Sequence, residues 1–215
     1  MTTLEDSQHT IQTVEHGVTI LACGGTEAVT ASYGYGANPS IITQKELEQK
    51  LADDTMDAAQ LNSVVMIQCV DSREEPRNYC SRVCCATALK HALHLKEKNP
   101  ELSIYILYRD MMTYGFAETY YTRAREAGVI FIQYRVDAKP RVKTAKESPE
   151  VMILEPILGR QLKIEADLVV LATGVVSNLP QDLAQSFGAS ADQDGFFQAA
   201  DSKWRPVDAL KEGVF

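Results

Sequence analysis

The chain contains 215 residues, of which 45% are hydrophobic, and carries a formal net charge of -8 at pH 7. This length and apolar content are enough for one large domain, or for one domain with pieces of a second. The acidic balance argues against a nucleic-acid-binding protein, because phosphate groups are bound by basic surfaces. The longest apolar runs, such as 64–67 and 168–172, are too short to cross a bilayer. We therefore expect a globular protein without direct membrane insertion.

The start of the chain and its cysteine usage indicate a reducing compartment. The N-terminus lacks a basic segment followed by an apolar one, which predicts a cytoplasmic protein without a secretory signal. There are five cysteines, an odd number, and three of them lie within six residues. A disulfide framework is therefore not expected, and metal binding, thiol chemistry and simple burial remain as explanations.

The first 60 residues predict one strand, a loop and a helix. The apolar run 18–22 is followed by a cysteine and two glycines, a pattern typical of a buried strand that ends in a turn. Glycine, serine, asparagine and proline recur in 28–42, which predicts a loop. Thr43 and Glu46 then match the capping box of a helix that we expect to end at Leu51.

From residue 63 onward, patterns typical of strands and helices alternate. Strands are predicted at 64–68, 103–108 and 129–134, and helices at 81–98 and 117–127. This order is typical of a parallel sheet whose crossover connections are right-handed. We therefore predict an α/β fold, a Rossmann-like domain of the FAD/NAD(P)-binding type with helices on both faces of a parallel sheet.

The C-terminal third predicts shorter elements. Two strands, at 151–157 and 161–164, predict a small antiparallel hairpin that follows a charged turn around 139–150. A buried strand over 167–172 then ends in a threonine and a glycine. Residues 213–215 resemble the beginning of a strand for which no partner is evident. The chain is therefore expected to be a truncated fragment of a longer protein.

Two predicted strands end in the same kind of segment, in which small residues and glycine follow an apolar run. The first ends at Ala22 and continues through Gly24 and Gly25, and the other ends just before Gly174. In both places the chain leaves a sheet where a cofactor could bind, as in flavoproteins with two dinucleotide-binding domains. We predict three segments: the end of an FAD-binding domain with a linker (1–60), an NAD(P)-binding-like domain (61–178), and a return toward the FAD-binding domain (179–215).

Four cysteines follow the first strand of the predicted parallel sheet in the pattern C-x10-C-x3-C-C: Cys69, Cys80, Cys84 and Cys85. Cys69 lies at the carboxyl end of its strand, where open α/β sheets bind their ligands. The glycine-rich loop that lets a dinucleotide pyrophosphate approach is missing from this segment. Because residues i and i+4 share a helix face, Cys80 and Cys84 are expected to point together toward Cys69.

Thiolates are soft ligands that select zinc or iron-sulfur clusters. Zinc sites usually use two closely spaced cysteine pairs, which the chain lacks, and the diverging directions of adjacent cysteines suit a polyhedral cluster. The helix N-terminus, together with Arg73, Arg77 and Arg82, can offset the negative charge of the thiolates. A [4Fe-4S] cluster is the leading hypothesis, and a zinc site, a thiol-disulfide couple and unreactive buried cysteines are the alternatives.

The cysteine segments and two further motifs have counterparts in a known family. The motifs are QCVDSR (68–73), YCSRVCC (79–85), YILYRD (105–110) and EAGV (126–129). Together they resemble the A subunit of heterodisulfide reductase and the related flavoprotein subunits of quinone-interacting membrane-bound oxidoreductase. The resemblance extends from His16 to the C-terminus, so it covers nearly the whole chain.

This resemblance implies a thioredoxin-reductase-like flavoprotein that passes electrons between FAD and a cluster. The four cysteines would be the cluster ligands, and FAD would be bound in the full-length protein. Two departures from the family matter: an N-terminal G-x-G-x-x-G fingerprint is absent, and so is the Gly-Asp segment expected after Phe215. Cys23 also stands where the family usually has threonine. We therefore expect Cys23 to be a small core residue. The candidate cofactor-binding residues are Ala22, Gly24, Gly25 and Gly174.

The resemblance also implies partners, namely other subunits of a heterodisulfide reductase-like or quinone-interacting oxidoreductase complex, with a homodimer as a further alternative. The leading functional hypothesis is a fragment of an electron-transfer oxidoreductase subunit that is inactive by itself. Two other classes are retained: a zinc-stapled domain that docks partner subunits, and a dithiol/disulfide reductase module that uses Cys84 with Cys80 or Cys85.

Other polar residues have plainer interpretations. His91 and His94 lie one turn apart on the predicted cysteine helix, and we expect both on a solvated or partner-facing surface. Asp110 follows the second parallel strand, where a dinucleotide fold keeps an acidic residue for ribose. Without a glycine loop before it, we expect Asp110 to have a structural role in a turn.

Overall fold

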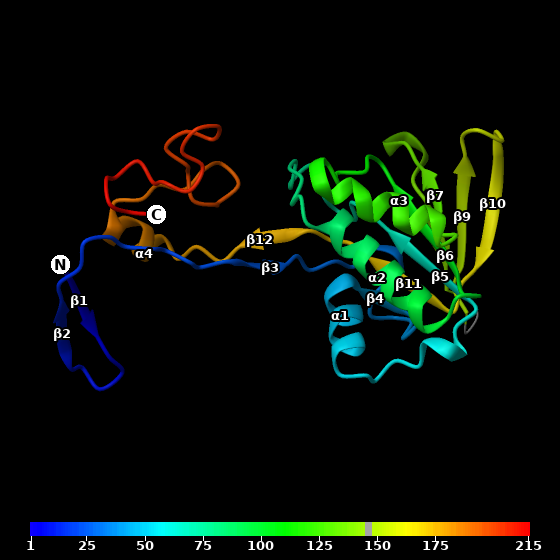
Figure 1. The fold of residues 1–215 in the computed structure, drawn as a ribbon, viewed down its shortest axis with the longest axis horizontal. Coiled ribbons are helices and arrows are strands. Elements are labelled where there is room, and N and C mark those ends of the chain that lie inside the picture. The colour runs from blue at the N-terminus through cyan, green and yellow to red at the C-terminus, as the bar shows by residue number, and fades with distance from the viewer. Residues whose placement is uncertain (145–147) are drawn as a thin grey trace. The chain divides into compact units, whose positions relative to one another are not determined.

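The computed structural model describes residues 1–144 and 148–215 and is drawn as a ribbon in Figure 1. Residues 145–147, part of the predicted charged turn, lie outside the described residues. The chain forms two compact units. Unit 1 consists of Met1–Thr26 and Val175–Phe215, and unit 2 of Glu27–Gly174. Unit 2 begins at Glu27, before the predicted boundary at residue 60, and the strand Ile41–Thr43 within 1–60 pairs with its sheet.

Unit 2 is built on a five-stranded sheet of order β4-β11-β5-β6-β7, in which all neighbouring strands are parallel. The predicted α/β class is therefore confirmed. β4 lies partly in the segment predicted as a loop, and its strand character comes from tertiary pairing of Ile41 with Val169 and of Thr43 with Leu171. The strands are β4 (Ile41–Thr43), β5 (Ser63–Ile67), β6 (Ser103–Tyr108), β7 (Ile130–Gln133) and β11 (Leu168–Leu171).

Three helices pack on one face of this sheet, and Figure 1 shows α2 and α3 lying beside each other. The helices are α1 (Gln44–Ala52), α2 (Cys84–Lys98) and α3 (Glu118–Glu126). α1 begins with the predicted capping box: the Glu46 N–H donates to Thr43 Oγ1 at 3.2 Å, and the Thr43 N–H donates to Glu46 Oε2 at 2.7 Å. The apolar cluster on this face joins helix residues to the strands; it includes Leu47, Ala88, Leu89, Leu95, Ala124, Val64, Met66 and Ile106.

The opposite face is covered by an antiparallel sheet of order β10-β9-β8. These strands are β8 (Arg141–Lys143), β9 (Glu150–Glu155) and β10 (Arg160–Glu165). The prediction of helices on both faces is therefore corrected for this face. Alternate residues of a strand point to one side, so the predicted hairpin can itself bury an apolar face. Its inward residues share a second core cluster with the parallel sheet: Val151, Ile153, Ile164, Val65, Ile67 and Val169.

Unit 1 contains short elements around a small core. These are the hairpin of β1 (Thr2–Glu5) and β2 (Ile11–Val14), the helix α4 (Gln181–Phe187), and the paired strands β3 (Gly25–Glu27) and β12 (Val175–Ser177), of which Glu27 belongs to unit 2. Its core cluster consists of Ala189, Ala209 and Val214.

Two predictions for unit 1 are wrong. The run 18–22 is not a buried strand, since Val18 and Ile20 are 56% and 75% exposed. Residues 213–215 do have a partner, because the Thr19 N–H donates to the Gly213 carbonyl at 2.8 Å and the Phe215 N–H donates to the Thr19 carbonyl at 2.9 Å. This parallel pairing joins segments from opposite ends of the chain, and no local pattern reveals it.

The structure also bears on membrane insertion. Among residues 1–144 and 148–215, no helix is both long enough and apolar enough to cross a bilayer.

Candidate metal centre

Cys69 lies at the carboxyl edge of the parallel sheet, two residues after β5 ends. The Gln68 N–H still donates to the Leu107 carbonyl at 2.9 Å, which continues the β5–β6 hydrogen bonding by one residue. The Val70 N–H then donates to the Ala172 carbonyl at 2.9 Å, beyond the end of β11. Cys69 therefore sits between the ends of two neighbouring strands, at the edge where α/β sheets bind ligands.

The loop that carries Cys69 has unusual backbone conformations. Cys69, Asp71 and Arg73 have φ values of 57°, 49° and 62°, and Arg82 has a φ of 63°. A non-glycine residue in this left-handed region costs about 1–3 kcal/mol and persists only where neighbouring contacts hold it. One such set of contacts is made by Asp71, which accepts hydrogen bonds from the hydroxyls of Thr30 and Ser32 at 2.5 and 2.7 Å.

α2 begins at Cys84, and this corrects the prediction that it begins at residue 81. Arg82 cannot belong to a right-handed helix because its φ is positive. Cys80 therefore lies in the loop before the helix, where its Sγ accepts a hydrogen bond from the Arg82 N–H at 3.4 Å. The expectation that Cys80 and Cys84 share a helix face is wrong for the same reason.

The fold nevertheless brings the four cysteines together. Burial is the largest cause that raises the pKa values of Cys69, Cys84 and Cys85. Negative charge on neighbouring thiols raises them further: Cys80 acts on Cys69, and Cys69 and Cys80 both act on Cys84 and on Cys85. Cys85 also acts on Cys84. Every pair among the four thiols is therefore within electrostatic reach. Burial and these neighbours raise the pKa of Cys84 to about 12. The raised pKa values of Cys69, Cys84 and Cys85 mean that these three thiols lose their protons most readily when a metal cation replaces them.

Arg73 contacts this group of thiols directly. Its Nη1 donates to Cys69 Sγ at 3.8 Å, and its Nη2 donates to Asp110 Oδ2 at 2.6 Å. Asp110 also contacts the site through its backbone, because the Cys85 thiol donates to its carbonyl oxygen at 3.7 Å. The expected structural role of Asp110 is therefore made specific: it ties Arg73 and Cys85 to the end of β6.

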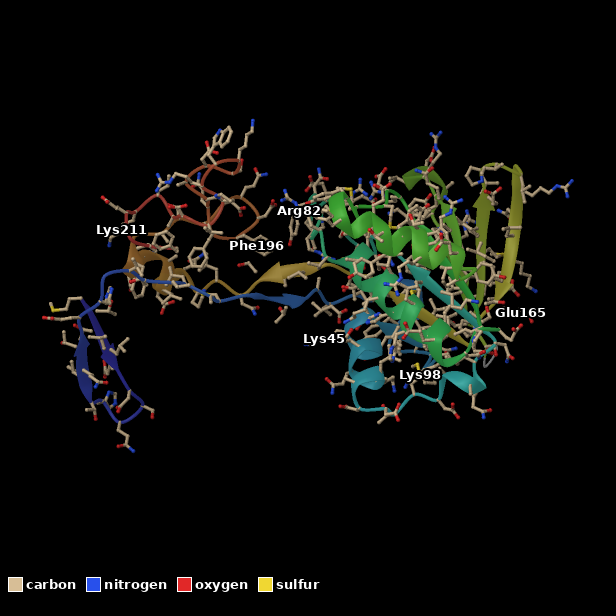
Figure 2. All side chains as sticks on the ribbon, viewed as in Figure 1. Lys45, Arg82, Lys98, Glu165, Phe196 and Lys211 are labelled. Carbon is tan, nitrogen blue, oxygen red and sulfur yellow. The ribbon has the colours of Figure 1, made fainter. Side chains whose placement is uncertain are left out.

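Arg77 and Arg82, the other two arginines expected to offset the charge of the thiolates, lie in different surroundings. Arg77 Nη1 donates to the Thr173 carbonyl at 2.8 Å, so it links the cysteine loop to the end of β11. Arg82 is exposed, and Figure 2 shows its side chain at the edge of unit 2 on the loop before α2. Arg109, which the sequence did not single out, donates to the carbonyls of Ser72 and Arg73 at 3.4 Å each and holds the same loop from β6.

Four cysteine thiols are a donor set that can bind an iron-sulfur cluster. A tetrahedral zinc site needs its sulfurs about 3.8 Å apart, since each Zn–S bond is about 2.3 Å. Within the described parts of the chain, no three His, Cys, Asp or Glu side chains are grouped so as to hold one metal ion. In a four-iron cluster each cysteine thiolate binds a different iron, so the four sulfurs surround the cluster and lie farther apart than around a single ion.

The predicted cofactor-binding residues divide between the units. Ala22, Gly24 and Gly25 belong to unit 1, and Gly174 to unit 2. A Cβ on Gly25 would lie 2.5 Å from Val175 Cγ1, so the close pairing of β3 and β12 requires glycine there. Gly174 has a φ of 83°, and a Cβ on it would lie 2.8 Å from Ser81 Oγ. Gly174 thus lets the cysteine loop approach the end of β11, and a flavin contact stays a prediction for all four residues.

His91 is not on the surface. Its side chain is 1% exposed, and its Nε2 lies 2.6 Å from Glu48 Oε2, which also pairs with Lys90 Nζ at 2.5 Å. Burial lowers the pKa of His91, although Glu48 acts in the opposite direction. The surface prediction is wrong for His91 because α1 packs on α2 and carries Glu48 to it. His94 remains 42% exposed.

Solved structures define the class of fold. The chain superposes on thioredoxin reductase from T. acidophilum with a TM-score of 0.52 and 16% identity, covering 92% of this chain and 55% of that one. It superposes on an NAD-dependent persulfide reductase from A. fulgidus with a TM-score of 0.51 and 15% identity, covering 99% of this chain and 35% of that one. The chain therefore has the fold of the flavoprotein disulfide reductases.

Relatives in sequence define a narrower class than the fold does. The chain is 37% identical to the iron-sulfur A subunit of the CoB–CoM heterodisulfide reductase of Methanocaldococcus jannaschii, over 92% of this chain and 33% of that protein. It is 36% identical to a protein of Archaeoglobus profundus that is named for its likeness to the heterodisulfide reductase A subunit, over 98% of this chain and 30% of that protein. No protein-family model matches the chain. The resemblance to the A subunit of heterodisulfide reductase is thus confirmed, and the chain spans about a third of the length of these relatives.

Proposed function

We propose that the chain is part of an oxidoreductase subunit that relays electrons between FAD and one [4Fe-4S] cluster. The cluster ligands are Cys69, Cys80, Cys84 and Cys85. The observation that carries this proposal is the gathering of four thiols at the carboxyl edge of the parallel sheet, where this class of fold places its ligands. The name of one relative, an iron-sulfur subunit, supports the cluster, and the name of a structural neighbour, an FAD-dependent pyridine nucleotide-disulphide oxidoreductase, supports the flavin.

A bound iron-sulfur cluster supplies transfer of single electrons. The chain contributes the environment in which that transfer takes place. The four cysteines give up their protons on binding, and the helix dipole of α2 together with Arg73 offsets the resulting negative charge. Partial burial lowers the pKa of Arg73, but the hydrogen bonds to Asp110 and Cys69 raise it more, so Arg73 stays charged. Burial of Cys85 excludes water from one side of the site.

FAD and partner proteins belong to the full-length subunit in this proposal. Ala22, Gly24, Gly25 and Gly174 would let its backbone approach the flavin, because small residues permit close contact. The partners are other subunits of a heterodisulfide reductase-like or quinone-interacting complex in the cytoplasm. The relatives' names each describe one lettered subunit of a reductase, which supports an assembly of several subunits.

The test is anaerobic reconstitution of the 215-residue chain with iron and sulfide, followed by metal analysis and EPR of the reduced protein. We expect about four irons and four sulfides per chain, with an EPR signal from a reduced cluster. Cys84→Ser should lower the iron content or alter the signal. Cys23→Ser is the matched control, because Cys23 lies in unit 1 and should leave both unchanged.

Other outcomes would identify the alternatives. Stoichiometric zinc without a redox signal would replace the cluster with a zinc-stapled docking domain. Two reactive thiols that form a reversible disulfide, with neither metal bound, would indicate a dithiol reductase module. Iron loss in Cys23→Ser as large as in Cys84→Ser would contradict the ligand set.

A further inference from the structure

Gln68 has a buried side-chain amide without a hydrogen-bond partner. The residue is 0% exposed, and among the described residues neither Nε2 nor Oε1 forms a hydrogen bond. A buried polar group left unpaired costs about 1–3 kcal/mol, and native proteins satisfy most such groups. The four residues that precede it, 64–67, are all buried and apolar. A glutamine at the end of this strand therefore calls for an explanation.

The side of the sheet on which the Gln68 side chain lies follows from β5, whose successive side chains point to opposite faces. Val64 and Met66 belong to the core cluster beneath α2, whereas Val65 and Ile67 belong to the cluster on the other face. The ladder continues to the Gln68 N–H, so the Gln68 side chain lies on the α2 side. α2 connects two parallel strands and therefore runs back along them, which places its first turn over the carboxyl end of β5.

That first turn carries two of the proposed cluster ligands. Cys84 and Cys85 are the first two residues of α2, and Cys69 directly follows Gln68 in the chain. The Gln68 side chain thus lies on the face of the sheet that α2 covers with the turn carrying Cys84 and Cys85, directly before Cys69 in the chain. A second buried amide already serves this turn, because Gln44 Nε2 donates to the Cys84 carbonyl at 3.0 Å.

The backbone of Gln68 is held on both sides. Its N–H donates to the Leu107 carbonyl at 2.9 Å, and its carbonyl accepts from the hydroxyl of Tyr134 at 2.5 Å. Tyr134 is itself buried and lies directly after β7. These contacts fix the position of the Gln68 backbone and the direction in which its side chain leaves the strand.

We propose that the Gln68 amide donates a hydrogen bond to a sulfur of the cluster, either a ligating thiolate or a bridging sulfide, and thereby raises its reduction potential. This inference rests on the proposed cluster. Reduction adds negative charge to the cluster, and a donor aimed at sulfur stabilises the reduced state more than the oxidised one. In a buried site the hydrogen bond is stronger than in water, and it satisfies the unpaired amide.

The central experiment compares wild type with Gln68→Met, which keeps the length of the side chain and removes the donor. Both are reconstituted anaerobically and titrated with a chemical reductant while EPR records the reduced fraction. At a fixed solution potential, the ratio of reduced to oxidised cluster should fall about tenfold in the variant, which corresponds to a potential lower by about 59 mV. An unchanged potential would overturn the inference and leave a buried water as the partner of the amide.

Ser63→Ala is the matched control. Among the described residues Ser63 Oγ is also buried without a partner, but it lies at the opposite end of β5. Ser63 lies five positions before Gln68, or about 16 Å along the strand, so its removal should not move the potential. An equal shift in both variants would indicate a general effect on the fold and would contradict a direct hydrogen bond.

A measurement on the wild-type protein covers the case in which Gln68→Met assembles no cluster. Glutamine labelled with 15N in its side chain should give a hyperfine coupling to the reduced cluster in pulsed EPR. Absence of that coupling would overturn the inference even if the cluster is intact. Failure of the wild type to assemble any cluster would instead refute the proposed function, so the two failures are distinguishable.

The unfolding temperature of the protein without its cluster gives a further test. Without the cluster the amide stays unpaired, so Gln68→Met should unfold at the same temperature as wild type or a higher one. With the cluster bound, this advantage should shrink or reverse. A variant that is destabilised equally in both forms would show that the amide serves the fold alone.

Discussion

Unit 2 buries one apolar cluster on each face of its parallel sheet, whereas unit 1 buries a single small cluster of three residues. The contrast extends to the surface. Unit 1 leaves Val18, Ile20 and Trp204 between 56% and 76% exposed, although their side chains are apolar. Unit 2 therefore has a core of its own that can hold the cysteine site rigidly. The proposed flavin contacts of unit 1 lie in the part of the chain with the smaller core.

The largest expected effect is a core substitution in unit 2. Leu89 is fully buried beneath the sheet, so Leu89→Ala should lower the free energy of unfolding by about 2–5 kcal/mol. Val18→Ala in unit 1 is the control, and it should change the value by less than about 0.5 kcal/mol. Denaturant unfolding followed by far-ultraviolet circular dichroism measures both. Similar losses in the two variants would mean that the units are equally dependent on packing.

The second effect tests the approach of β11 to the cysteine loop. Gly174→Ala should destabilise unit 2 by about 1–3 kcal/mol, because alanine is strained at a φ of 83° and its Cβ would meet Ser81 Oγ. Gly36→Ala is the matched control, since Gly36 has a φ of 80° and a Cβ added there would have no atom within 4 Å. A larger loss in Gly174→Ala isolates the contact. Equal losses would leave backbone strain as the whole cause.

The third effect concerns pH. Burial lowers the pKa of His91, so below about pH 6.5 the unfolded chain binds a proton that the folded chain does not. The free energy of unfolding should therefore fall as pH drops below about 6.5, by at most about 1.4 kcal/mol per pH unit. Hydrogen bonds from Lys90 and His91 lower the pKa of Glu48, so Glu48 stays ionised in the upper part of this range.

His91→Gln and His94→Gln separate this effect from other titrations. The first variant should flatten the dependence of unfolding free energy on pH between about 6.5 and 5, while the second, at an exposed position with only a minor effect on His91, should change it far less. Denaturant melts at several pH values provide the measurement. A slope that survives in His91→Gln would assign it to another group.

The smallest effect is at the start of α1. Thr43→Ala removes the hydroxyl that accepts from the Glu46 N–H and should cost about 1 kcal/mol. Thr43→Ser keeps the hydroxyl and is the control. Because α1 belongs to unit 2, the loss should appear in the main unfolding transition. No difference between the two variants would mean that the cap contributes little beside the packing of Leu47.

The strands and the capped helix of unit 2 could be predicted because their signals are local. β6 is one short, mainly apolar run of consecutive residues. The threonine and the glutamate of the α1 cap, Thr43 and Glu46, are likewise close to each other in the sequence. The start of α2 could not be predicted, since only the folded loop forces Arg82 into a left-handed conformation. The burial of His91 depends on Glu48, which is distant in the sequence.

The α/β class, the spacing of the four cysteines and the absence of a phosphate-binding glycine loop between Cys69 and Cys80 could all be read from the order of residues. These are properties of residue order and period. The folded structure was needed to show that the four thiols come within electrostatic reach of one another, that Arg73 contacts both Cys69 and Asp110, and that the amide of Gln68 is buried without a partner among the described residues. Each of these depends on contacts between residues from different strands and loops, and such contacts arise only when the sheet is assembled.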